Sequence, residues 1–170
     1  TFQQITCLVD THRTREPSGD LLEYALFVLF FPQLIAGPIV HLRDVRDQFR
    51  EPSRFRLRWS AAATGLADCV CGLGKKVVIA DSLAPTADAV FDSAAAGDSP
   101  AFAAAWIGTL AYTFQLYFDF SGYSDMAIGL GWLFGVRLPT NFEAPYQAIS
   151  IADFWRRWHI TLSRFLRDYL

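Results

Sequence analysis

A stretch of twenty residues without a charged side chain, 99–118, constrains the fold of this chain more than any other feature. An α-helix of that length extends about 30 Å, which matches the hydrocarbon thickness of a lipid bilayer. Ser99-Pro100 is typical of a helix start, and Tyr117 lies near the other end, where interfacial aromatic residues are common. We therefore predict a membrane-spanning helix here. A buried helix of a soluble protein is the alternative.

The composition of the chain agrees with a membrane location. Hydrophobic residues make up 52% of the 170 positions and charged residues 19%, compared with about 25% charged residues in a typical soluble domain. Three other segments also favour the membrane: 21–40, 59–80 and 126–137. We predict an all-α fold, namely part of a multi-pass membrane helical bundle with broken or re-entrant segments and an amphipathic C-terminal helix.

Two of these segments are predicted to be interrupted. Pro32 and Pro38 lie inside the first of them, so we expect a helix to about Phe31 and a non-helical stretch after it. Such backbone at membrane depth needs cover from protein or from a wet cavity. Residues 126–137 are too short to span the bilayer upright, and a polar break at 119–125 is expected before them.

The segment 59–80 combines small residues with two lysines. Its glycines at positions 65, 72 and 74 would let a neighbouring helix approach closely, so we expect a helix packed within a bundle. Lys75 and Lys76 are expected to reach the membrane interface or to pair with Asp68 or Asp81.

Two connecting segments carry opposite charge. Residues 41–58 contain six arginines, whereas 81–98 contain four aspartates and neither lysine nor arginine. By the positive-inside rule, the first segment would be cytoplasmic and the second would lie across the membrane. A solvated loop with a surface helix is the alternative for 41–58, and 81–98 is expected to be a loop with short helical turns.

The final residues, 153–170, are predicted to form an amphipathic helix that starts with a capping box at 150–153. Trp155, Trp158 and His159 recur at helical spacing and share an aromatic face. An imidazole set into an apolar wall suits general acid–base chemistry, which makes His159 the candidate catalytic residue. A histidine that only bonds a backbone carbonyl within an aromatic cluster is the alternative.

Five neighbours of His159 complete this candidate substrate-binding and donor-binding site: Trp155, Arg156, Arg157, Trp158 and Ser163. The two arginines are expected to bind phosphate groups of a carrier or cofactor. The two tryptophans are expected to line a tunnel for an acyl or pantetheine chain. The serine lies one helical turn after the histidine and is expected to bond the imidazole ring.

A second polar cluster lies in the expected break before the last apolar segment. Asp119 and Tyr123 are candidate donor-binding residues, and a helix junction capped by Asp125 is the alternative. Asp119 ends an uncharged span and is expected to pair with an arginine of the final helix. His12 and His41 stand in polar segments and are expected at the surface.

Other kinds of site find no support in the sequence. Cys69-Val-Cys71 has neither the spacing nor a nearby histidine for zinc, so no metal is expected. The net charge of −2 gives no indication of a nucleic-acid partner.

Several motifs resemble those of the membrane-bound O-acyltransferases, and in particular the bacterial alginate O-acetylation branch. The main ones are FDFSGYSDMAIGLGWLFGVRLP (118–139), NFEAPY (141–146) and DFWRRWHITLSRFLRDYL (153–170), while PQLIAGPIV (32–40) and GLGKKVVIAD (72–81) also fit. The resemblance implies that residues 1–170 are an internal part of a single membrane domain with a tunnel through the bilayer. It also implies a multi-pass protein of the bacterial inner membrane.

The resemblance further implies a reaction. An acyl group, here acetyl, would pass from acetyl-CoA or another cytoplasmic thioester, with no bound cofactor, to a hydroxyl of an extracytoplasmic polysaccharide such as alginate, or to a partner protein. Periplasmic acetyltransferases are the expected protein partners. His159 matches one active-site histidine and is expected to polarise or orient, while a second histidine beyond Leu170 is expected to be the base.

Two alternatives to this reaction remain open. One is D-alanyl transfer to teichoic acid, because the D-alanyl transferases share the Trp-His-x-Thr-Leu-Ser element of residues 158–163. The other is a segment of a polysaccharide export or transport protein, in which Asp119 and the arginines would line a path.

Overall fold

The computed structural model describes residues 2–14, 20–34, 36–56 and 58–170. These residues form helices and no β-strand, as the all-α prediction requires. The elements are α1 (Phe2–Thr14), α2 (Leu21–Leu29), η1 (Phe31–Gln33), α3 (Leu42–Phe49), η2 (Pro52–Phe55), α4 (Trp59–Gly74), η3 (Lys75–Ala80), α5 (Asp81–Ala95), α6 (Phe102–Leu133), η4 (Pro145–Gln147), α7 (Ile151–Arg157) and α8 (Ile160–Tyr169).

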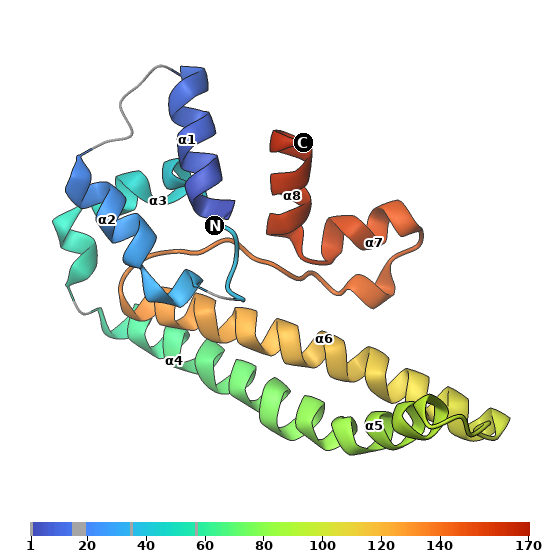
Figure 1. The fold of residues 1–170 in the computed structure, drawn as a ribbon. Helices are drawn as coiled ribbons and strands as arrows, with labels where there is room; N and C mark the ends of the chain where they lie inside the picture. Colours follow the sequence, from blue (N-terminus) through green and yellow to red (C-terminus); the bar gives the residue numbers. More distant parts are fainter. Residues whose placement is uncertain (1, 15–19, 35, 57) are drawn as a thin grey trace.

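A long helical hairpin forms one layer of the molecule (Figure 1). One arm is the continuous run of α4, the single π-helical turn η3 and α5, and the other arm is α6, which returns alongside it. The arms touch through glycines. A Cβ atom on Gly72 would lie 2.5 Å from the carbonyl oxygen of Gly122, and a Cβ atom on Gly129 would lie 2.5 Å from that of Gly65. Small residues therefore set the distance between the two arms, as the 59–80 pattern predicts.

The predicted break at 119–125 is wrong, because α6 runs without interruption through it and through most of 126–137. The polar side chains there find partners on the other arm of the hairpin. Lys75 Nζ lies 2.5 Å from Asp125 Oδ2, and Lys76 Nζ lies 2.8 Å from Asp119 Oδ1. The carboxylates are neutralised by these ion pairs, so the helix has no need to end. Asp125 caps no helix, and Asp119 pairs with a lysine in place of the expected arginine.

The predicted loop at 81–98 is also wrong over most of its length, since Asp81–Ala95 form α5. This segment is rich in alanine, the residue with the strongest helix preference. It also packs closely on α6, where a Cβ atom on Gly108 would lie 2.6 Å from Cβ of Val90. Lys76 reaches Asp81 at 2.7 Å, which confirms one of the expected lysine pairs.

The proline-containing segment is interrupted as predicted. α2 ends at Leu29, η1 covers Phe31–Gln33, and the next α-helix begins only at Leu42. Tyr123 on α6 stabilises this broken segment, because its hydroxyl donates to the carbonyl oxygen of Leu34 at 3.2 Å. None of the helices in the described part of the chain combines the length, hydropathy and low charge that crossing a membrane requires.

A second layer, made of α1, α2, α3 and α8, lies over one end of the hairpin (Figure 1). An extended segment leaves α6 and crosses beneath this layer to reach α7. The buried core joins helices and extended segment through Cys7, Phe27, Val40, Leu42, Val45, Phe49, Val136 and Leu138. Apolar burial therefore fixes the extended segment in place, and that segment carries part of the candidate site.

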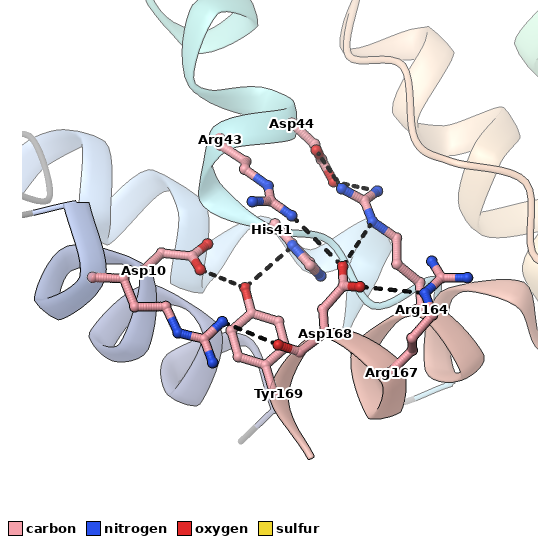
Figure 2. Close-up of polar contacts among 9 residues, drawn as sticks. Asp10, His41, Arg43, Asp44, Arg164, Arg167, Asp168 and Tyr169 are labelled. Carbon is pink, nitrogen blue, oxygen red and sulfur yellow. Dashed lines mark hydrogen bonds and ion pairs between the residues drawn. The ribbon is translucent and has the colours of Figure 1, made fainter.

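A network of polar contacts attaches α8 to α1 and α3 (Figure 2). Arg164 makes a bidentate contact with Asp44, at 3.1 and 3.2 Å, and the hydroxyl of Tyr169 donates to Asp10 at 2.7 Å. His41 lies inside this network with no exposed surface and packs edge-on against Tyr169, so its predicted surface position is wrong. Burial and the nearby Arg164 lower the pKa of His41 below its usual value.

Candidate active site around His159

Residues 153–170 do not form the single helix that their periodicity predicts. α7 ends at Arg157 and α8 begins at Ile160, with Trp158 and His159 between them. His159 takes the left-handed conformation, with φ 44° and ψ 55°, which non-glycine residues rarely adopt. The histidine therefore stands at the N-cap of α8 and not on the face of a continuous helix.

The extended segment after α6 accounts for this break. The backbone N–H of Ile160 donates to the carbonyl oxygen of Asn141, and the N–H of Glu143 donates to the carbonyl oxygen of Arg157, each at 2.9 Å. These two bonds take groups that a continuous helix would pair with its own turns. At the other end of α7, the Ser150 hydroxyl accepts a hydrogen bond from the backbone N–H of Asp153 at 3.1 Å. This bond is the one that the predicted capping box requires of Ser150.

The imidazole ring of His159 is partly buried and held on three sides. Phe120 of α6 packs edge-on, with ring centroids 4.8 Å apart, and Phe142 stacks at 6.4 Å. Nδ1 lies 2.9 Å from Oδ1 of Asn141. Burial among these rings lowers the pKa of His159 below its usual value, because the charged form loses hydration. The ring is therefore neutral at pH 7.

Asn141, the single asparagine of the chain, is the site residue that the sequence pattern missed. It is 1% exposed and, besides His159, it bonds two residues, Thr161 and Ser124. Oδ1 accepts from the hydroxyl of Thr161 at 2.9 Å and from its backbone N–H at 3.3 Å, while Nδ2 donates to the hydroxyl of Ser124 at 3.3 Å. The available signal was a single amide beside the aromatic Phe142, since an amide buries well only when it has partners.

An aromatic cluster surrounds Trp158 next to the histidine. Its ring stacks on Phe154 with centroids 5.6 Å apart, and it packs edge-on against Phe142 at 5.1 Å. Tyr117 of α6 and Tyr146 of η4 complete the cluster, with ring centroids 6.2 and 6.3 Å from that of Trp158. Of the predicted tunnel-lining residues, Trp158 thus shares a wall with His159.

The other predicted neighbours of His159 point elsewhere. Trp155 is 52% exposed, and Arg156 is exposed beside it. Arg157 contacts Asp153 at 3.1 Å and holds the pKa of that carboxyl below its usual range. Ser163 does not bond the imidazole, because its hydroxyl donates to the carbonyl oxygen of Trp155 at 3.0 Å.

The two candidate residues on α6, Asp119 and Tyr123, bond partners other than His159. Asp119 faces Lys76 on the opposite arm of the hairpin, and Tyr123 bonds the broken segment at Leu34. Phe120 and Ser124, on the same helix, instead face the histidine and its asparagine. The arrangement therefore brings together His159, Trp158, Asn141, Phe120 and Phe142 as one site.

Known proteins resemble this chain over nearly its whole length. It is 58% identical over 149 residues to a peptidoglycan O-acetyltransferase of Helicobacter pylori, which covers 88% of this chain and 28% of that protein. It is 49% identical over 170 residues to a probable alginate O-acetylase of Azotobacter vinelandii, which covers 99% of this chain and 33% of that protein. A teichoic acid D-alanyltransferase of Bacillus subtilis is 30% identical over 149 residues, which is 85% of this chain and 36% of that protein.

The chain spans about a third of the length of these relatives. The model of the membrane-bound O-acyltransferase family matches residues 10–170. The match includes the three motifs on which the resemblance rested, together with His159 and Asn141. The chain therefore belongs to the membrane-bound O-acyltransferase family.

Proposed function

We propose that this chain carries the His159 part of the active site of a membrane-bound O-acetyltransferase that modifies a polysaccharide. The observation that carries the proposal is an imidazole, packed against Phe120 and Phe142 and bonded to a buried amide, within the residues matched by the family model. The bond to the amide uses Nδ1, and no hydrogen bond of the described residues involves Nε2 of this ring. It is the atom of the site that is free to meet a substrate.

The reaction is an acyl transfer from a thioester to an alcohol. The hydroxyl oxygen of the acceptor attacks the carbonyl carbon of the acetyl thioester, and the carbon–sulfur bond breaks. The hydroxyl proton moves to a ring nitrogen, and the departing thiolate takes up a proton to become the free thiol. The donor in this proposal is acetyl-CoA or another cytoplasmic acyl thioester, and Trp158 with its aromatic neighbours lines the approach to the histidine.

The identities favour acetyl over D-alanyl as the transferred group. The two acetyl-transferring relatives are 58% and 49% identical to this chain, compared with 30% for the D-alanyltransferase. The names of the same two relatives favour a polysaccharide acceptor, with peptidoglycan and alginate as the first candidates. We place the whole protein in the bacterial inner membrane as a multi-pass protein, with periplasmic acetyltransferases as partners.

The test uses the full-length protein in membranes, a labelled acetyl thioester, and peptidoglycan and alginate as parallel acceptors. The wild-type protein should transfer acetyl groups to one of them, and His159→Ala should lose that transfer. His12→Ala is the matched control, because His12 is exposed on α1 and outside the site. Transfer that survives in His159→Ala, or transfer of D-alanine in place of acetyl, would overturn the proposal.

A further inference from the structure

We propose that Asn141 is a positioning residue that fixes one tautomer of His159, so that Nε2 meets the substrate as a hydrogen-bond and proton acceptor. This inference rests on the proposed acyltransferase function for its chemistry. Its geometry rests on the hydrogen bonds that connect His159, Asn141, Thr161, Ser124 and Ile39.

The orientation of the Asn141 amide follows from its neighbours. The backbone N–H of Thr161 can only donate a hydrogen bond, so the amide atom that faces it at 3.3 Å is the oxygen. The Thr161 hydroxyl already accepts from the backbone N–H of Ile39 at 2.9 Å, which leaves its own proton to donate to the same oxygen at 2.9 Å. The amide nitrogen then faces the Ser124 hydroxyl, where it donates.

The amide oxygen in turn decides which ring nitrogen carries the proton. This oxygen has no hydrogen of its own and lies 2.9 Å from Nδ1 of His159, so Nδ1 must be the donor. A neutral imidazole has one N–H, and its other nitrogen, Nε2, therefore carries a lone pair. Burial keeps the pKa of the ring low, and the groups packed on it are Phe120, Phe142 and the amide, with no charged side chain of the described residues among the causes of the shift.

The residues that orient the Asn141 amide are themselves buried. Thr161 and Ser124 are 3% and 1% exposed, and neither lies next to Asn141 in the sequence. The Thr161 hydroxyl is bonded in turn by the backbone N–H of Ile39, in the broken segment between η1 and α3. This segment therefore also takes part in orienting the ring. Contacts from four separate parts of the chain thus determine that the lone pair of the ring lies on Nε2.

The fixed tautomer changes the role expected for His159. From the sequence we expected a second histidine to be the base and His159 to have a polarising or orienting role. A polarising group must donate a hydrogen bond, and the free nitrogen of neutral His159 has none to donate. The geometry instead assigns His159 to the acceptor hydroxyl, whose proton Nε2 can take as the oxygen attacks.

Asn141→Asp tests this role in the full-length protein. All four groups that bond the amide, from His159, Thr161 and Ser124, can act as donors to a carboxylate, because the Ser124 hydroxyl can turn its proton toward it. A carboxylate with these donors stays ionised and favours the imidazolium form of His159, which raises the histidine pKa by about one to three units. The acidic limb of the pH–rate profile for acetyl transfer should move up by the same amount, with transfer recovered at high pH.

Gln147→Glu is the matched control, since it makes the same amide-to-carboxylate change at an exposed position of the same connecting segment. Its acidic limb should stay where the wild-type limb lies. Asn141→Ala should instead lower the rate at every pH, by about tenfold or more, because Nδ1 of the ring loses the hydrogen bond that orients it. An Asn141→Asp limb that stays at the wild-type pH would overturn the assigned role.

A spectroscopic measurement separates this inference from the proposed function. Nitrogen-15 shifts of labelled histidine distinguish a protonated ring nitrogen from an unprotonated one, and comparison with His159→Gln assigns the signals. The wild-type ring should show Nδ1 protonated and Nε2 unprotonated near neutral pH, whatever group the enzyme transfers. The opposite tautomer would overturn the inference even if acetyl transfer is observed, and absent transfer with the expected tautomer would overturn only the function.

Discussion

The close approach of the two hairpin arms makes a sharp prediction about two glycines that lie two positions apart. Gly72 packs against α6, where an added Cβ atom would lie 2.5 Å from the carbonyl oxygen of Gly122 and 2.8 Å from the backbone nitrogen of Met126. Gly74 has no atom within 4 Å of the same added carbon. Gly72→Ala and Gly74→Ala therefore make the same chemical change in opposite packing environments.

The magnitudes follow from two opposing effects. Glycine in a helix interior is less stable than alanine by about 0.5–1 kcal/mol, so both substitutions gain that amount from the backbone. Only Gly72→Ala forces the arms apart, and overpacking of this kind costs about 1–3 kcal/mol. Gly74→Ala should then stabilise the protein by about 0.5–1 kcal/mol, and Gly72→Ala should lie about 1–3 kcal/mol below it in free energy of unfolding.

Titration of the full-length protein with sodium dodecyl sulfate in mixed micelles, followed by tryptophan fluorescence, would measure both free energies of unfolding. The backbone gain cancels when the two variants are compared, so the difference between them reports the contact of the arms. Equal stabilities for the two variants would refute the argument that the glycines set the distance between α4 and α6.

Three further predictions concern histidine burial and local contacts. Burial lowers the pKa of His41 below its ordinary value of 6.5, so the unfolded chain binds more protons than the folded one once the pH falls below about 6.5. Stability should therefore decrease as the pH falls below that value, and less so in His41→Gln, as thermal unfolding would show. Arg164→Lys should lose the bidentate contact with Asp44 and destabilise the protein by about 0.5–1 kcal/mol, with a double-mutant cycle against Asp44→Asn as the measurement. Ser150→Ala should remove the cap on Asp153 at a cost of about 1 kcal/mol, which hydrogen exchange in the first turn of α7 would report.

Local chemistry made part of the fold predictable from the sequence. The prolines at 32 and 38 interrupt the first apolar segment because a proline ring cannot continue a helix, whatever surrounds it. Ser150 caps α7 because the partner of its hydroxyl lies only three residues away. Residues 102–118 of the uncharged stretch form the first half of α6 because nothing in them opposes a helix.

Two of the errors share a physical cause, which is that the deciding partner lies far away in the sequence. Asp119 and Asp125 were interpreted as a polar break, but Lys76 and Lys75 on the other arm of the hairpin neutralise them within a continuous helix. The buried position of His41 depends in the same way on α8, which lies more than a hundred residues later. Periodicity describes one element at a time and contains no information about such partners.

The candidate site was predictable in its histidine but not in its geometry. His159 was recognisable from the aromatic residues and arginines around it. The break between α7 and α8 at Trp158 and His159 depends on backbone bonds from the segment at 141–143, and the partner of Nδ1 comes from the same segment. Asn141 could not be identified as part of the site without the path of the chain after α6.

The left-handed backbone of His159 allows one more test of what the ring contributes. Ala144 adopts nearly the same conformation, with φ 42° against φ 44° for His159, and each residue loses about 1–2 kcal/mol relative to a relaxed backbone. Ala144 is exposed and its methyl group has little to lose, so Ala144→Gly should stabilise the protein by about 1 kcal/mol and leave acetyl transfer unchanged.

His159→Gly should gain the same backbone relief but lose the hydrogen bond to Asn141, which is worth about 1 kcal/mol, and the packing on Phe120 and Phe142. Its free energy of unfolding should therefore lie at or below the wild-type value, and acetyl transfer should be lost. If His159→Gly instead stabilised the protein as much as Ala144→Gly, the contacts of the ring would contribute nothing to folding. The unfavourable backbone at His159 persists, on this reasoning, because only that conformation brings the imidazole to Asn141 while Nε2 stays free.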